Sequence, residues 1–214
     1  MSIADKLTTI AENEQRVYDA GKQAEQYDFW NTFQKGGNVE VNYQHAFSHG
    51  RYTDETYNPI YPLKCDSYNT TASQYIFYGS SITDTKVEII VGQSRATTSC
   101  FQNCKQMHTI RKLTLNGSNS MTDTFSNCSA LVNIEIGGVI SRNMDIHWSP
   151  LSKASIKSII EHLSDTESGR TLTLSESAVN TAFGINVKDE TTYPEGSEYY
   201  NLRHSKDNWT ISYS

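Results

Sequence analysis

The amino-acid sequence predicts an α/β solenoid with a repeat of about 24 residues, an N-terminal helix, and larger strand–helix rungs at its C-terminal end. Three observations predict this fold. Phe101 and Phe125 open two copies of one pattern, in which a cysteine follows the phenylalanine by three residues. Alternating apolar and polar residues follow each copy, as expected of half-buried strands. After residue 150 the apolar spacing becomes helical. A unit this small cannot bury its apolar edge alone, so it must stack on neighbours.

The repeat is clearest in residues 125–136, which read F-x-x-C-x-x-L-x-x-I-x-I. The copy that begins at Phe101 keeps the first four apolar positions, and Phe77 lies 24 residues upstream of it. Trp148 follows Phe125 by 23 residues and is predicted to take the aromatic position of the next rung. We therefore expect a repeat core formed by Phe77, Phe101, Cys104, Leu113, Leu115, Phe125, Cys128, Leu131, Ile134, Ile136 and Trp148.

Each rung should contain a short strand with its apolar residues facing inward, at residues 87–89, 113–115 and 134–136. Thr114 and Glu135 then point outward, because successive side chains of a strand alternate between its faces. Solenoids commonly bind partners on such a face, so both residues are candidates for partner binding. Leu115 lies three residues further from Phe101 than Ile136 lies from Phe125, which predicts an insertion around His108.

Residues 1–36 form the first predicted region, a helix over 2–34 with Ser2 as its N-cap. Of the four residues at the second apolar heptad position, Leu7, Glu14, Gly21 and Asp28, three are polar or glycine. The helix therefore either self-associates as a short coiled coil or packs against the end of the solenoid. Homo-oligomerisation would use the apolar positions at spacings of three, four and seven, which are Ile3, Leu7, Ile10, Val17 and Ala24.

Residues 37–74 form an irregular, tyrosine-rich region in which Pro59 and Pro62 break any long element. We predict that it caps the repeats of residues 75–150, with a degenerate first rung at 43–48, because terminal repeats are atypical. Tyrosine also offers a large contact area at a small entropy cost. The alternative is therefore a binding surface formed by Tyr52, Tyr57 and Tyr61.

Residues 151–214 are predicted to form the strand–helix rungs and the C-terminal cap. Ser152 is a suitable N-cap for a helix whose apolar stripe contains Ile156, Ile159, Ile160 and Leu163. A strand at 171–174, a short helix at 177–183 and a last strand at 209–213 follow. Strand, helix and strand thus recur at about 37 residues.

The phrase F-x-N-C-x-x-L-x-x-I-x-I resembles the BspA-like leucine-rich repeats of bacterial surface proteins and of phage or prophage structural proteins. This resemblance covers roughly residues 75–148, and the whole chain is similar to short phage- or prophage-encoded repeat proteins of gut bacteria. It implies a leucine-rich repeat solenoid that binds a protein or a cell-surface glycan. It also implies a place in a virion or on a bacterial cell surface, reached by assembly. Fold alone does not assign a function.

The net charge of -6 argues against nucleic acid as the main partner, since phosphate binding needs a basic face. No window approaches the ~20 apolar residues that span a bilayer, so we expect no membrane insertion. The opening residues lack a basic segment followed by an apolar one, so no secretory signal is predicted.

The four cysteines raise the question of a metal site or a disulfide. Cys100 and Cys104 are four residues apart, but no second close pair or histidine cluster completes a zinc site. We expect buried free thiols that act as small apolar groups, with a disulfide between Cys104 and Cys128 as the alternative. The sequence contains no phosphate loop, nucleophile elbow or metalloprotease motif. It therefore predicts no catalytic residue, cofactor or metal.

The sequence thus predicts a non-enzymatic structural or adhesion module in which the helix assembles and the solenoid recognises a partner. The resemblance implies that this module is a phage tail or prophage structural component. The first alternative is a bacterial cell-surface protein that interacts with a host. A less favoured alternative is a carbohydrate-active enzyme, whose carboxylates would come from distant parts of the chain.

Overall fold

The computed structural model describes residues 46–49, 52–55, 57, 59, 62–65, 74–92, 97–116 and 120–214. The chain divides into two units, Met1–Val39 and Glu40–Ser214, and all of the described residues lie in the second unit. The helix predicted over 2–34 lies outside the described residues. The same holds for its candidate association residues Ile3, Leu7, Ile10, Val17 and Ala24.

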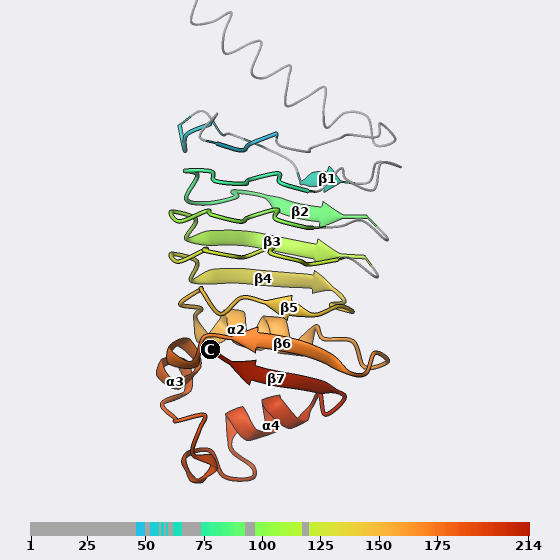
Figure 1. Ribbon diagram of the computed structural model, residues 1–214, viewed down its shortest axis with the longest axis vertical. Coiled ribbons are helices and arrows are strands. Elements are labelled where there is room, and N and C mark those ends of the chain that lie inside the picture. Colours follow the sequence, from blue (N-terminus) through green and yellow to red (C-terminus); the bar gives the residue numbers. More distant parts are fainter. Residues whose placement is uncertain are drawn as a thin grey trace, which may run out of the picture. The chain divides into compact units, whose positions relative to one another are not determined.

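The described part of the second unit is a β-solenoid of about four turns, joined by a few helices towards its C-terminal end (Figure 1). Four parallel strands form its first sheet, in the order β1 (Leu63–Cys65), β2 (Glu88–Val91), β3 (Thr109–Leu115) and β4 (Asn133–Gly138). Paired residues are 26 positions apart between β1 and β2 and 24 apart between β2 and β3, as for Leu63, Ile89 and Leu113. Consecutive strands run parallel, so the chain returns to the same edge of the sheet after each one.

Strand β3 contains a bulge at residues 111–112, where it uses one residue more than β4 to cover the same span. Leu115 consequently pairs with Gly138, two positions beyond Ile136. The three-residue insertion expected around His108 is therefore wrong. The difference is one bulge residue, and the strand of the first copy continues past the position that corresponds to Ile136.

A column of phenylalanine rings forms the core of these turns. Phe77 and Phe101 stack with centroids 5.4 Å apart, and Phe101 and Phe125 with centroids 5.7 Å apart; both pairs are within 7° of parallel. Phe47, which belongs to the predicted first rung at 43–48, stacks on Phe77 at 5.1 Å and continues the column by one turn. Residues 43–45 of that rung lie outside the described residues. The following predicted core residues are confirmed as buried: Phe77, Phe101, Cys104, Leu113, Leu115, Phe125, Cys128, Leu131, Ile134 and Ile136.

The return side of each of these turns is a tight bend whose backbone bonds to the next bend. The amide of Phe101 donates to the carbonyl of Thr124 at 3.0 Å, for example. The residue two positions after each phenylalanine has a positive φ, which asparagine and glycine tolerate better than most residues. This requirement explains the asparagine of the F-x-N-C phrase. We call these positions the corner column: His49, Gly79, Asn103 and Asn127.

The C-terminal part contains a second parallel sheet, in the order β5 (Met144–Asp145), β6 (Arg170–Leu174) and β7 (Trp209–Tyr213). In Figure 1 the arrows of these strands point opposite to those of β1–β4, so this sheet is formed on the return side of the coil. The helices are α2 (Lys153–Glu161), α3 (Glu176–Phe183) and α4 (Glu198–His204), with a 3-10 turn at Glu190–Thr192. The predicted helices and strands are confirmed here, and α4 is an addition to them.

Helix α2 lies beside β4, in the place that a fifth strand of the first sheet would occupy. Ser152 caps the helix, as predicted. The backbone amides of Ile134 and Ile136 donate to the hydroxyls of Ser155 and Ser158, each at 2.9 Å. Two serine side chains therefore satisfy amides at the edge of the first sheet, a role that the sequence did not indicate.

The predicted core position of Trp148 is wrong, because its side chain is 49% exposed. Ile146 is fully buried instead. The amide of Ser149 donates to the carbonyl of Ile146 at 3.1 Å. The same bond joins the fourth and first residues of the bends at 77–80, 101–104 and 125–128. Ile146 follows Phe125 by 21 residues, so the connection is two residues shorter than expected. Trp148 therefore falls at the position that Asn127 occupies one turn earlier.

Candidate functional site

The outward side chains of the first sheet form an ordered charged row. The ammonium of Lys112 lies 3.7 Å from a carboxylate oxygen of Glu88 and 3.9 Å from one of Glu135. The hydroxyl of Thr114 donates to Glu88 at 2.5 Å. Strand alternation puts these side chains on one face, because their neighbours Ile89, Leu113, Ile134 and Ile136 face the core. We call Glu88, Lys112, Thr114 and Glu135 the outer row.

Two glycines keep the end of β4 flat beside the outer row. A Cβ on Gly137 would lie 2.4 Å from the hydroxyl of Thr114 and 2.8 Å from Cε of Lys112, so both side chains extend across this residue. Gly138 has a φ of +74°, and a Cβ there would lie 2.0 Å from the carbonyl oxygen of Leu115. Gly137 therefore lets Thr114 and Lys112 lie close against the backbone of β4, and Gly138 lets that backbone lie close to Leu115.

The outer row includes two of the residues predicted to contact a partner. The Glu135 side chain is 63% exposed, which leaves its carboxylate accessible. Thr114 is half-buried and holds Glu88, so its role is to position a neighbouring charge. Sequence reasoning missed Glu88 and Lys112. Their signal is the alternation itself, since each lies one residue before a core position.

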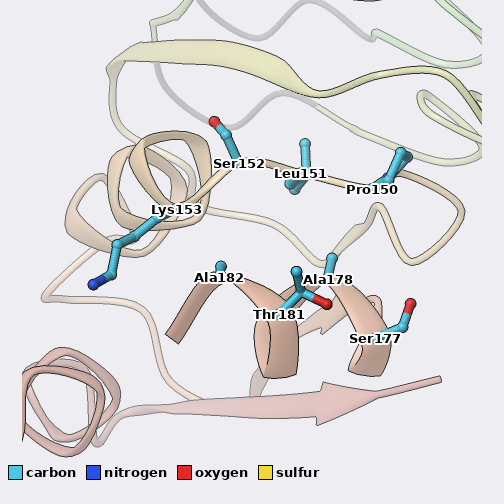
Figure 2. Close-up of a pocket in the computed structure, with 8 residues that line it drawn as sticks. All are labelled: Pro150, Leu151, Ser152, Lys153, Ser177, Ala178, Thr181 and Ala182. Carbon is cyan, nitrogen blue, oxygen red and sulfur yellow. The ribbon is translucent and has the colours of Figure 1, made fainter. Parts of the chain in front are cut away.

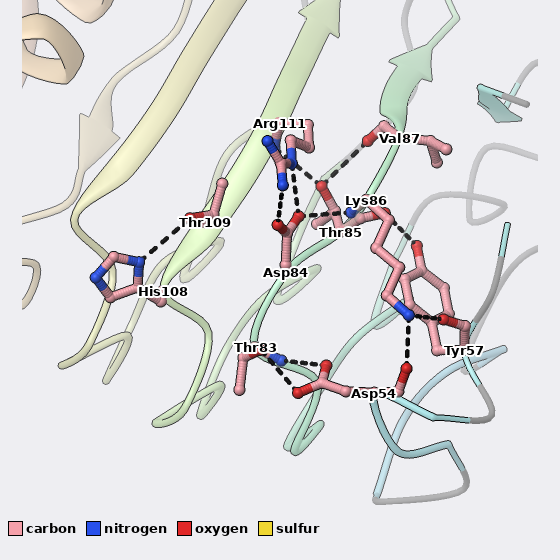
Figure 3. Close-up of polar contacts among 10 residues, drawn as sticks. All are labelled: Asp54, Tyr57, Thr83, Asp84, Thr85, Lys86, Val87, His108, Thr109 and Arg111. Atoms are coloured by element: carbon pink, nitrogen blue, oxygen red, sulfur yellow. Dashed lines mark hydrogen bonds and ion pairs between the residues drawn. The ribbon is translucent and has the colours of Figure 1, made fainter. Parts of the chain in front are cut away.

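A second polar cluster lies where β2 and β3 begin (Figure 3). The guanidinium of Arg111 donates to both oxygens of Asp84, at 3.0 and 2.6 Å. Asp54 accepts from the amide of Thr83 at 2.9 Å and from its hydroxyl at 2.7 Å. Such two-point contacts fix the direction of both partners. The cluster joins successive turns rather than presenting unpaired charges.

Tyr57 belongs to this second cluster and is fully buried. Its hydroxyl donates to the carbonyl of Thr85 at 2.8 Å, and its ring lies 5.1 Å from that of Phe47. Lys86 donates to the carbonyl of Tyr57 at 2.6 Å. The alternative of partner binding by Tyr57 is therefore wrong, because the apolar ring is needed to cover the first turn of the core. This finding supports the predicted cap.

Of the other two tyrosines proposed as a binding surface, the structure describes one. Tyr52 is half-buried, with its ring edge-on to Phe47 at 5.3 Å. Tyr61 lies outside the described residues.

A pocket of about 310 Å³ lies between the start of α2 and helix α3 (Figure 2). Its lining is Pro150, Leu151, Ser152, Lys153, Ser177, Ala178, Thr181 and Ala182. Lys153 is the titratable residue of this lining, and its ammonium is 2.6 Å from a carboxylate oxygen of Glu198. The pocket therefore presents methyl and hydroxyl groups rather than an acid–base pair.

A smaller cavity of about 290 Å³ opens where β3, β4 and α2 meet. Its lining includes Arg111, Glu135 and Ser158. Because Glu135 also belongs to the outer row, the cavity continues the charged face to the junction with α2.

All four cysteines are buried and free of disulfide bonds, which confirms the first interpretation and not the disulfide. The thiol of Cys104 donates to the carbonyl of Phe77 at 2.8 Å, and that of Cys128 to the carbonyl of Phe101 at 3.0 Å. Burial raises the pKa of Cys104 to about 12 and also raises the pKa of Cys128. The thiolate, which is the reactive form, is therefore disfavoured.

Two absences hold for the part of the chain that the structure describes. No group of three or more His, Cys, Asp or Glu residues there could hold a metal ion. None of the helices described is both long and apolar enough to cross a membrane.

Comparison of the chain with protein-family models, with curated proteins and with solved structures found no match. Its own fold and surface thus define its class: a β-solenoid with a flat, charged outer sheet face.

Proposed function

We propose that this protein is a non-enzymatic binding module that contacts its partner through the outer face of its first sheet. The observation that carries the proposal is the outer row, in which Lys112 lies between the carboxylates of Glu88 and Glu135. Side chains held by neighbours lose less conformational entropy when a partner binds. A fixed pattern of alternating charge favours one arrangement of opposite charges on that partner.

The shape of the face supports the same proposal. Gly137 has no side chain to compete with Thr114 and Lys112 for the space beside the row. Flat parallel rungs present their outward residues at a regular spacing of about 4.8 Å, and solenoids use such surfaces to bind other proteins. A protein surface with complementary charges is therefore the partner that fits the outer row.

The biological setting is part of the proposal. The F-x-N-C-x-x-L-x-x-I-x-I phrase supports a leucine-rich repeat of the BspA-like kind with a period near 24. That resemblance favours a phage tail or prophage component that reaches a bacterial surface by assembly, with residues 2–34 as the assembly element. A bacterial cell-surface protein that binds a host is the second candidate setting.

Charge reversal on the outer row tests the proposal. Labelled full-length protein is titrated onto intact cells of a panel of gut bacteria and onto cultured intestinal epithelial cells. The double variant Glu88→Lys with Glu135→Lys should lose binding by at least about tenfold, because two attractive contacts become repulsive. The matched control is Glu161→Lys with Glu195→Lys, which makes the same charge change at exposed positions away from the row.

The two cell types separate the two settings. Binding to bacteria favours the phage or prophage role, and binding to epithelial cells favours the host-interaction role. Wild-type affinity in the outer-row variant would contradict the proposal, as would equal losses in the outer-row and control variants. Circular dichroism and thermal unfolding establish that each variant is folded.

A further inference from the structure

The corner column forms a second surface, separate from the outer row. Its residues follow each core residue of the bends by two positions, and the bends are joined by backbone hydrogen bonds. The amide of His49 donates to Tyr78 at 2.9 Å, that of Gly79 to Gln102 at 2.8 Å, and that of Asn103 to Ser126 at 2.8 Å. Successive corner residues are therefore neighbours in space, one turn apart.

Trp148 follows Ile146 by two positions, and the hydroxyl of the next residue, Ser149, donates to the carbonyl of Cys128 at 3.1 Å. Cys128 follows Asn127 directly, so Trp148 lies at the C-terminal end of this column. Its indole is 49% exposed and lies 4.6 Å from the ring of His147. His147 is itself held by Asp145, with 2.6 Å between Nδ1 and a carboxylate oxygen. The indole thus presents a large aromatic surface beside a histidine of fixed orientation. At the opposite end, the ring of His49 lies 5.1 Å from that of Tyr78.

Carboxamides lie between these aromatic ends. The side-chain amide of Asn127 donates to the side-chain oxygen of Asn103 at 2.9 Å, so the two side chains are aligned along the column. A carboxamide has two donors and two acceptor positions. This bond uses one donor of Asn127 and one acceptor position of Asn103, which leaves further capacity on both amides.

Side chains of the corner column carry no carboxylate and no ammonium, in contrast to the outer row. Its five residues, spaced by about 4.8 Å, give the column a length of roughly 19 Å. Aromatic faces bind apolar C–H surfaces, and aligned amides exchange hydrogen bonds with hydroxyl groups. An uncharged sugar chain carries both kinds of group in alternation along its length.

We propose that the corner column binds a neutral linear glycan, with Trp148 as the stacking platform and Asn103 and Asn127 as the hydrogen-bonding residues. This inference goes beyond the proposed function, because it assigns a different ligand to a different surface. The glycan would lie along the solenoid, across successive turns rather than within one of them.

The test uses affinity electrophoresis of the full chain in gels that contain one neutral polysaccharide each: a β-1,4-glucan derivative, a β-1,4-mannan, a β-1,4-xylan or an α-1,6-glucan. A polygalacturonate gel tests for binding through charge. We expect retardation by at least one neutral polymer. Trp148→Ala should weaken it by about tenfold or more, as for a tryptophan that dominates an interface. Trp148→Phe should retain part of the binding, because it keeps an aromatic face.

Further variants separate this site from the outer row. Asn103→Ser with Asn127→Ser should weaken retardation severalfold while keeping small polar residues at the corner. The outer-row variant Glu88→Lys with Glu135→Lys should bind the neutral polymer as the wild type does. The inference is overturned if no neutral polymer retards the protein, if only polygalacturonate does, or if Trp148→Ala binds normally. None of these outcomes bears on cell binding through the outer row.

Discussion

The first four turns and the C-terminal turns place their sheets on opposite sides of the coil. In the first part, β1–β4 form the sheet and the return side is a set of tight bends. In the second part, β5–β7 form the sheet on the return side, and α2 takes the place beside β4 (Figure 1). One chain therefore builds two kinds of turn that stack on each other.

Turn length accounts for this difference. Paired residues are 24 positions apart between β2 and β3, but 39 apart between β6 and β7, as for Arg170 and Trp209. A helix advances 1.5 Å per residue and a strand about 3.3 Å, so a helix needs more than twice as many residues to cover one side of a turn. The 39-residue turn between β6 and β7 contains α3 and α4, and the 28-residue turn between β5 and β6 contains α2 alone. The turns of 24 and 26 residues between β1, β2 and β3 form strands and bends.

The two parts also differ in what fills their cores. The first turns bury stacked phenylalanines and all four cysteines. The C-terminal part buries isoleucines of α2 together with Tyr193 and Tyr199. The hydroxyl groups of Tyr199 and Tyr213 lie 2.5 Å apart, so this second core includes polar groups that are paired within it. The difference gives each part its own response to mutation and pH.

Removal of the central phenylalanine ring of the column should cause the largest loss of folding stability. Phe101→Ala deletes the ring that stacks on both Phe77 and Phe125, and it should lower the free energy of unfolding by about 3–5 kcal/mol. Urea unfolding monitored by circular dichroism measures the change. Hydrogen exchange should show faster exchange in 74–116 than in 170–183. Equal acceleration in both segments would contradict the view that the two parts have separate cores.

A smaller effect is expected at the junction between the two parts. Ser155→Ala leaves the amide of Ile134 without its hydroxyl acceptor, in a position that is 3% exposed, and should cost about 1–3 kcal/mol. The exposed Ser129→Ala provides a matched control with the same chemical change. If both variants unfold at the same urea concentration, α2 does not stabilise the edge of β4 through this hydroxyl.

The smallest loss of folding stability per residue is expected from mildly alkaline pH. Burial raises the pKa of Cys104 from an ordinary 9.0 to about 12, so the folded state retains a proton that the unfolded chain releases. Its stabilising contribution is therefore complete below pH 9 and is lost as the pH rises towards 12. At pH 9.5 the loss should be about 1 kcal/mol for each such thiol.

Because all four cysteines lie between residues 65 and 128, this loss should affect the first turns before the C-terminal part. Thiol labelling at pH 8 and pH 9.5, with hydrogen exchange on the same samples, measures it. Between pH 8 and pH 9.5, the labelling rate of the folded protein should rise by a larger factor than that of a denatured control, in which only thiol ionisation changes. Earlier exchange in 170–183 than in 97–116 would contradict the prediction.

Local spacing predicted much of this architecture. The recurrence of phenylalanine and cysteine predicted the buried core, and alternation predicted the outward direction of Thr114 and Glu135. The helical stripe after residue 150 predicted α2. These features follow from the periods of strands and helices, which are properties of the backbone and are visible in any single segment.

Features that depend on how one turn meets the next could not be read from spacing. The bulge in β3 and the two-residue shortening before Ile146 each alter the register between neighbouring turns. The second of these moves Trp148 from the expected core to the corner column. The serine contacts at the edge of β4 likewise require the helix and the strand to be side by side.

The sequence by itself thus determined that the chain forms stacked turns, and which residues of the repeat face inward, because burial of a period-two pattern leaves one choice of face. The tertiary structure alone decided which side of the coil carries the sheet and which side chains meet across turns. Those outcomes depend on backbone hydrogen bonds between residues more than 20 positions apart, and small changes in connection length decide which residues come into contact.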